Sequence, residues 1–157
     1  MATEYASSAT DGAGSTLEVG DGASPENFTA IAEITTITPG PMTTAVIDIT
    51  HLLSPNAHKE KLPGLRDTTG FGLEGNWLPE NSTQNNSAVA PEGLVYLART
   101  RGVRNFQIVL GNSGSPAIVW PFRGFVESFQ PGPLTIGQKK SFKASIMPSK
   151  DIASSLP

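Results

Sequence analysis

Two β-rich runs on either side of Pro39-Gly40-Pro41 constrain the fold of this chain more than any other feature. The run NFTAIAEITTIT (27–38) places Phe, Ala and Ile on one parity and Thr, Ile and Glu on the other, and MTTAVIDIT (42–50) alternates again. Alternation with a period of two residues is typical of a strand with one buried face. Because a Pro-Gly turn separates the two runs, we predict that they pair as a β-hairpin.

Most of the remaining sequence also predicts strands. The expected segments are STLEV (15–19), GFGLEGNWL (70–78), VRNFQIVL (103–110), AIVWPFRGFVESF (117–129, interrupted by Pro121) and TIGQKKSFKASIM (135–147). One helix is predicted over PEGLVYLARTRG (91–102), with Pro91 near its start and Gly102 as its stop. Residues 51–69 show neither a strand nor a helix period and are expected to form a long, functional loop.

Composition limits the class of protein. The 157 residues include 16 Gly and 13 Pro but no Cys. This length suits one domain, and such a composition favours short strands joined by turns. Without cysteine there is no disulfide, thiol nucleophile or Cys-type zinc site. The sequence shows no membrane-span-length apolar run and no signal-peptide pattern, so we expect neither membrane insertion nor secretion.

Charge is unevenly distributed along the chain. Residues 1–58 contain seven acidic residues and no Lys or Arg, whereas residues 59–157 contain seven acidic residues and eleven Lys or Arg. The two parts carry formal charges of −7 and +4, consistent with the net charge of −3. This asymmetry is either sampling variation or a sign that the N-terminal part of one copy faces the C-terminal part of the next. No basic footprint typical of nucleic-acid binding is present.

The spacing Gly70, Gly72, Gly75 matches the G-x-G-x-x-G motif of dinucleotide-binding loops. That motif requires a buried strand before it and a helix after it, so that helix N–H groups can hold a pyrophosphate. Here the preceding residues are polar, and Pro79 with several Asn and Ser residues follows. We therefore interpret the stretch as a strand whose glycines permit a bend or the close approach of another backbone.

The only two histidines, His51 and His58, lie near Asp48 and Glu60. A metal site needs three or four converging ligands, which loop spacing alone does not enforce. Asp48, His51 and Ser54 also provide the residue types of a hydrolase triad, but no nucleophile turn or oxyanion loop accompanies them. We predict a structural or binding protein that is not an enzyme and needs no cofactor or metal.

Several short motifs follow one another in a characteristic order along the chain. They are Ala32–Thr35, then Asp48, Thr50, His51 and Ser54, then Gly64, Leu65 and Asp67, and finally Trp120, Phe122, Gly124, Phe125 and Val126. This ordered set resembles the major tail tube proteins of long-tailed, lambda-like bacteriophages, and the resemblance covers roughly residues 14–148. Many members of that family continue into an immunoglobulin-like domain, which we do not expect here because few residues follow the last motif.

The resemblance implies a mainly β fold, a β-sandwich or partial barrel with one flanking α-helix. Its inner sheet would complete a β-barrel across a hexameric ring, and stacked rings would form the tube. The implied partners are other copies of the chain, the tape-measure protein, the tail terminator and tail-tip proteins, and double-stranded DNA in transit. The implied location is the virion tail, with assembly in the cytoplasm of the bacterial host.

Domain and site expectations follow from combining the resemblance with the residue patterns. We expect a flexible arm (1–14), a tail tube domain (15–148) with a long loop (52–69), and a C-terminal tail (149–157). The loop residues expected to contact other subunits or rings are Leu52, Ser54, His58, Lys59, Glu60, Lys61, Leu65, Arg66 and Asp67. The acidic residues expected on strands, facing either the channel or outer solvent, are Glu33, Asp48 and Glu74.

Two alternatives remain open at the level of sequence. The first is a tube subunit of a contractile tail, a type VI secretion system or a gene-transfer particle. The second is a monomeric β-sandwich that binds a carbohydrate or a peptide.

Overall fold

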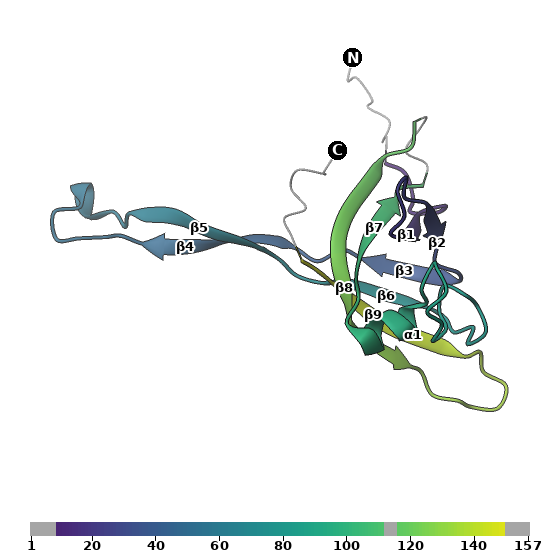
Figure 1. The fold of residues 1–157 in the computed structure, drawn as a ribbon. Helices are drawn as coiled ribbons and strands as arrows, with labels where there is room; N and C mark the ends of the chain where they lie inside the picture. The colour runs from purple at the N-terminus through teal and green to yellow at the C-terminus, as the bar shows by residue number, and fades with distance from the viewer. Residues whose placement is uncertain (1–8, 112–115, 150–157) are drawn as a thin grey trace, which may run out of the picture.

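The computed structural model describes residues 9–111 and 116–149 (Figure 1). Within them, nine strands, one α-helix and one 3₁₀ turn are present. In chain order they are β1 (Thr16–Gly20), β2 (Phe28–Ala30), β3 (Ile34–Thr38), β4 (Met42–Asp48), η1 (Pro55–Ala57), β5 (Lys61–Thr68), β6 (Phe71–Asn76), α1 (Leu94–Thr100), β7 (Val103–Val109), β8 (Val119–Pro131) and β9 (Ser141–Pro148). The mainly β class with one helix is confirmed.

Seven strands form one antiparallel sheet in the order β2-β1-β7-β8-β9-β6-β3, and β4 and β5 form a separate two-stranded sheet. The long strand β8 curves through the body (Figure 1) and has a bulge between Val126 and Ser128. Although β1 and β3 are far apart in the strand order, they contact each other. The sheet therefore curls on itself as a partial barrel, and α1 packs against β8.

The core lies inside this curl and follows the predicted alternation. Phe122 on β8 stacks on Phe71 of β6 and Phe106 of β7, with ring centroids 4.4 and 5.6 Å apart. Helix α1 adds Leu94 and Leu97, which are both buried. The other buried apolar side chains are Leu17, Val19, Ile31, Leu73, Ile108, Val126, Phe142, Ala144 and Ile146.

Gly75 occupies a position of the predicted strand where a side chain would not fit. A Cβ at this position would lie 2.6 Å from the Glu33 carbonyl oxygen and 2.8 Å from the Phe142 ring. The same carbonyl accepts a hydrogen bond from the Asn76 N–H at 2.9 Å. Close approach of another backbone explains the glycine, and β6 is a strand with no helix start after it.

The hairpin predicted around Pro39-Gly40-Pro41 is wrong. Strand β3 pairs with β6, while β4 pairs with β5, so the chain continues outward through Pro39–Pro41 and returns through β5. Thr69 lies opposite this segment and its N–H donates to the Pro41 carbonyl at 3.3 Å. The Pro-Gly-Pro segment is an interruption in a long two-stranded arm, and the reversal occurs near η1.

The predicted loop over 52–69 is correspondingly shorter than expected, because Lys61–Thr68 forms β5. Its Pro63 lies opposite Val46, next to a shift in the register of β4 and β5. Proline is tolerated at such a position in an edge strand because its missing N–H breaks no continuous ladder.

Two further boundaries differ from the predictions. Helix α1 begins only at Leu94, with Gly93 at its N-cap, and ends at Arg101, which adopts the left-handed conformation at φ 58°. Strand β9 begins at Ser141, so residues 135–140 are not part of it. Of the expected arm (1–14) and tail (149–157), residues 1–8 and 150–157 lie outside the described residues.

Candidate assembly surfaces

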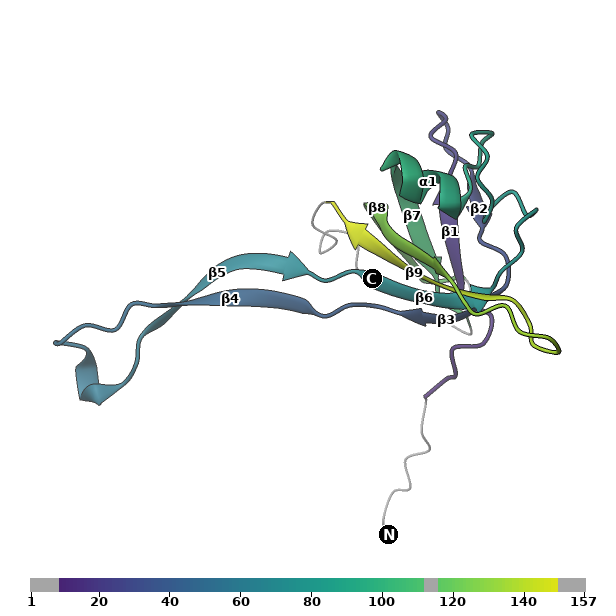
Figure 2. The same cartoon turned by 90° about the horizontal axis from the view of Figure 1, so that it is seen from below.

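Among the described residues, no other strand or helix packs extensively against the β4–β5 arm. It extends away from the body in both views (Figures 1 and 2), and the nine residues 41–49 alone span about 30 Å at the rise of an extended strand. Its exposed large apolar side chains are Met42, Val46, Ile47, Ile49, Leu52, Leu53, Leu62 and Leu65. An isolated two-stranded ribbon is marginally stable, and a contiguous exposed apolar surface marks an interaction site.

The tip of the arm has a defined hydrogen-bond network. The Ser54 hydroxyl donates to the Glu60 carboxylate at 2.7 Å and accepts the His51 N–H at 3.0 Å. His51 Nε2 lies 3.4 Å from the same carboxylate. The turn therefore holds Leu52 and Leu53 in the solvent, with exposed fractions of 104% and 86%.

This geometry does not assemble the hydrolase triad considered above. The Asp48 carboxylate accepts the Thr50 N–H at 2.9 Å, and His51 Nδ1 accepts the Leu53 N–H at 3.1 Å, so each group serves the turn. Among residues 9–111 and 116–149, no cluster of three or more His, Asp or Glu side chains could hold a metal ion.

The residues expected to contact other subunits all lie on this arm. Leu52, Ser54, His58, Lys59 and Glu60 lie on the segment between β4 and β5, and Lys61, Leu65, Arg66 and Asp67 lie on β5. All are exposed except Ser54 and Glu60, which are half-buried in the tip network. The sequence analysis missed the apolar residues of β4. The adjacent apolar residues Val46 and Ile47 could have indicated them, because neighbouring residues of a strand point to opposite faces and both faces are therefore apolar here.

The three acidic residues have different environments. Glu33 does not lie on a strand as expected: it precedes β3 at φ 58° and accepts a hydrogen bond from Asn76 Nδ2 at 2.7 Å. Asp48 ends β4, and the Thr50 hydroxyl and then the Thr50 N–H lower the pKa of its carboxyl. Glu74 on β6 forms an ion pair with Lys143 at 2.9 Å, and this hydrogen bond raises the pKa of Lys143.

The side of the sheet that faces away from the core is polar across β3, β6, β9 and β8. One cross-strand row places Thr36 beside Glu74, Lys143 and Gln130. The next row places Thr38 beside Gly72, Ser145 and Ser128. Both rows consist of polar side chains and one glycine, and the Glu74–Lys143 pair is charge-compensated. These strands thus have one face on the core and one face suited to water.

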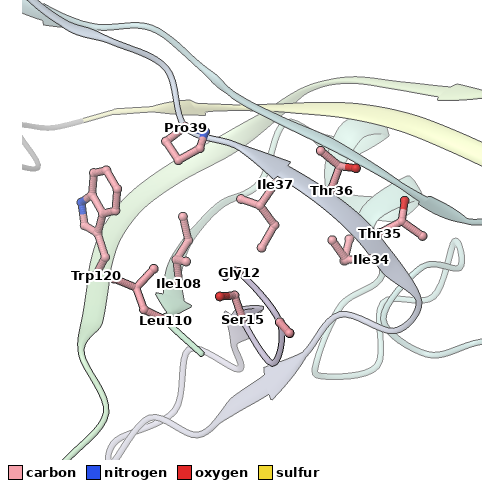
Figure 3. Close-up of a pocket in the computed structure, with 11 residues that line it drawn as sticks. Gly12, Ser15, Ile34, Thr35, Thr36, Ile37, Pro39, Ile108, Leu110 and Trp120 are labelled. Carbon is pink, nitrogen blue, oxygen red and sulfur yellow. The ribbon is translucent and has the colours of Figure 1, made fainter. Parts of the chain in front are cut away.

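An apolar pocket of about 440 Å³ lies where β3 approaches the ends of β7 and β8 (Figure 3). Ile34 and Ile37 line it from β3, and Ile108, Leu110 and Trp120 face them from the other side (Figure 3). Its remaining lining residues are Gly12, Ala13, Ser15, Thr35, Thr36 and Pro39, so none carries a formal charge. The sequence analysis did not identify this pocket, because it joins segments far apart in the chain.

The part of the chain that the structure describes contains no helix long and apolar enough to span a membrane. No curated protein matches the chain. Among solved structures, this chain is similar to a chain in the tail of an empty gene transfer agent (GTA) particle, which was computed with C6 symmetry. The TM-score is 0.64 and the identity is 14%, and the match covers 91% of this chain and 96% of that chain. The sheath/tube terminator structure of an extracellular contractile injection system contains a similar chain with a TM-score of 0.66 and 14% identity, covering 95% and 96%. A chain in the anti-feeding prophage baseplate has a TM-score of 0.60 and 16% identity, covering 96% and 95%.

At these identities the structural similarities show a shared fold. The family assignment comes from the sequence, because the family model described as "Lambda phage tail tube protein, TTP" matches residues 12–149. This match spans most of the chain, both sheets and the helix, and it indicates a structural role. The chain belongs to the lambda phage tail tube protein family.

Proposed function

We propose that this chain polymerises as stacked hexameric rings into a hollow tail tube that conducts double-stranded DNA into the host. The observation that carries the proposal is the β4–β5 arm, whose eight large apolar side chains are exposed in the single chain. Exposure of this kind favours burial against another copy, since removing apolar surface from water drives association. The C6 symmetry of the similar gene transfer agent tail supports the ring size.

The curled sheet supports the same assembly. Strands β2 and β3 are its two ends, so each presents backbone groups that another copy can pair with. Pairing across copies would join the polar faces of β3, β6 and β9 into a continuous channel wall. Such a wall, with Glu74 compensated by Lys143, offers DNA few fixed positive charges and so avoids tight phosphate binding.

This role implies further protein partners. The channel would enclose the tape-measure protein during assembly in the host cytoplasm, and the tube ends would bind the terminator and tail-tip proteins. A tube subunit of a gene-transfer particle or of a contractile injection system is the second candidate, favoured by the similarity to chains in both kinds of particle.

A shortened arm tests the proposal. Val46 and Pro63 are register partners, so an Asn-Gly turn can replace residues 47–62 and close the hairpin early. We expect a folded protein with the thermal midpoint of the body but no elongation into tubes, because no core residue lies in the deleted segment. Assembly is scored by sedimentation and negative-stain electron microscopy beside the full chain. Normal tubes from the shortened protein would contradict the role of the arm.

A further inference from the structure

The pocket at the β3 end of the sheet is large enough for a pair of aliphatic side chains. Its volume of about 440 Å³ exceeds the ~150 Å³ of an apolar cavity that holds benzene. Gly12 and Pro39 in its lining are exposed, so the pocket is accessible from solvent. Beside it, β3 is the last strand in the order of the described sheet, and one of its edges is free to pair.

The tip of the β4–β5 arm has matching chemistry. Leu52 and Leu53 are almost fully exposed, and the Ser54–Glu60 and His51 contacts hold the turn that presents them. Residues 49–57 contain no Asp, Glu, Lys or Arg, and neither does the pocket lining. The carboxylate of the tip network, Glu60, already accepts a hydrogen bond from Ser54, so Leu52 and Leu53 can enter an uncharged pocket without leaving a buried ion unpaired.

The tip cannot reach the pocket of its own chain. Pro39 lines the pocket, and the arm begins two residues later at Pro41 and runs straight away from the body (Figures 1 and 2). The tip therefore meets the pocket of another copy, which makes the contact heterologous and able to propagate through a ring or stack.

We propose that Leu52 and Leu53 at the arm tip of one copy occupy the Ile34–Ile37–Trp120 pocket of another copy. This inference rests on the proposed function and names the interface through which the arm acts. The other exposed apolar protrusion, Leu134 and Ile136, is followed by two adjacent like charges, Lys139 and Lys140. Beside the arm tip, by contrast, Lys59 is adjacent to the opposite charge of Glu60.

Because the chain contains no cysteine, paired cysteine substitutions give a specific test. Leu53→Cys combined with Pro39→Cys, at an exposed residue of the pocket lining, is assembled into tubes and mildly oxidised. This pair is expected to give a ladder of disulfide-linked multimers on a non-reducing denaturing gel. Each single variant can form dimers at most. The matched control, Leu53→Cys with Val89→Cys, is expected to give no ladder, since Val89 is 75% exposed but lies outside the pocket.

Assembly measurements give a second readout that needs no disulfide geometry. Leu53→Ser should raise the critical concentration for tube formation about tenfold or more, because it removes one buried leucine from each contact. Val89→Ser should change it by less than about twofold, as expected for a surface site away from the contact.

The outcomes separate the two claims. Failure of the wild-type chain to form tubes would contradict the proposed function together with this inference. If wild-type tubes form but neither the ladder nor the effect of Leu53→Ser is seen, only the pocket assignment is overturned. A ladder from Pro39→Cys with Ile136→Cys instead would give the pocket to the β8–β9 connection and would likewise overturn it.

Discussion

At the scale of single residues, the stacked rings of Phe71, Phe122 and Phe106 connect three strands of the curled sheet. Phe122 is the middle ring and is 6% exposed. We expect Phe122→Ala to lower the free energy of unfolding by about 3–5 kcal/mol, through lost burial and the cavity left behind. Urea unfolding of the unassembled protein measures this value. Leu65→Ala, at an 87% exposed position, should change it by less than about 0.5 kcal/mol, and a similar loss in both variants would contradict the assigned core.

Asp48 allows a test of the arm at low pH. Its folded-state pKa is lowered from the usual value of 3.8, first by the Thr50 hydroxyl and then by the Thr50 N–H. A lowered carboxyl pKa contributes stability that is present above the unfolded pKa and is lost as pH falls through the folded pKa. Thr50→Val should therefore move the Asp48 pKa upward, toward 3.8, in a carboxyl-carbon NMR titration. The lowered pKa of Asp21, caused first by the Ala23 N–H, serves as an internal reference that should not move.

At the scale of elements, helix α1 ends in a strained residue. Arg101 adopts φ 58°, and its N–H donates to the Leu97 carbonyl. Glycine adopts this conformation without a Cβ penalty, so Arg101→Gly should stabilise the protein by about 1 kcal/mol in thermal unfolding. Arg99→Gly, inside the helix, should destabilise it by a similar amount. Equal destabilisation by both substitutions would show that the left-handed end of α1 is incorrect.

The body strands could be predicted because one face of each is buried. Phe71 and Leu73 on β6 and Phe106 and Ile108 on β7 follow the alternation seen in the sequence. On the arm both faces are exposed, so parity carries no information about pairing and the register depends on the partner strand. KLPGLRDT has no strand period of its own and is a strand because β4 lies beside it. Pro39-Gly40-Pro41 was misread as a turn because the alternation in 27–38 and 42–50 does not show which strand each run pairs with.

The candidate site was only partly predictable. The residues from Leu52 to Asp67 that were expected to contact other subunits lie on the projecting arm, and their contacts with other copies stay a prediction. Glu33 was misplaced on a strand, since a left-handed residue before β3 leaves no mark on the alternation. The pocket combines residues 12–15 with β3, β7 and β8, and only the curl of the sheet brings these segments together.

At the scale of the whole molecule, the three acidic residues test which surface faces the channel. Of Glu33→Lys, Asp48→Lys and Glu74→Lys, each variant whose residue lines the channel should permit tube assembly, because its side chain stays in water there; all three are exposed in the single chain. A variant that lines the channel should slow DNA release from assembled particles, and more so at low salt, where phosphate attraction is less screened. Glu74→Lys should have the largest effect, since it also frees Lys143. Release at the normal rate in low salt by all three variants would remove these residues from the channel wall.

The central claim is that copies of this chain build a hollow tube by burying the arm of one copy against another. Cryo-electron microscopy of the concentrated full-length protein, without metal, nucleotide or nucleic acid, tests it most directly. We predict hollow tubes of stacked sixfold rings, with the polar rows of β3, β6 and β9 on the channel wall and the β4–β5 arm buried between copies. Monomers that persist at high concentration across several salts with a tail-tip nucleus supplied, or filaments without a channel, would contradict the account.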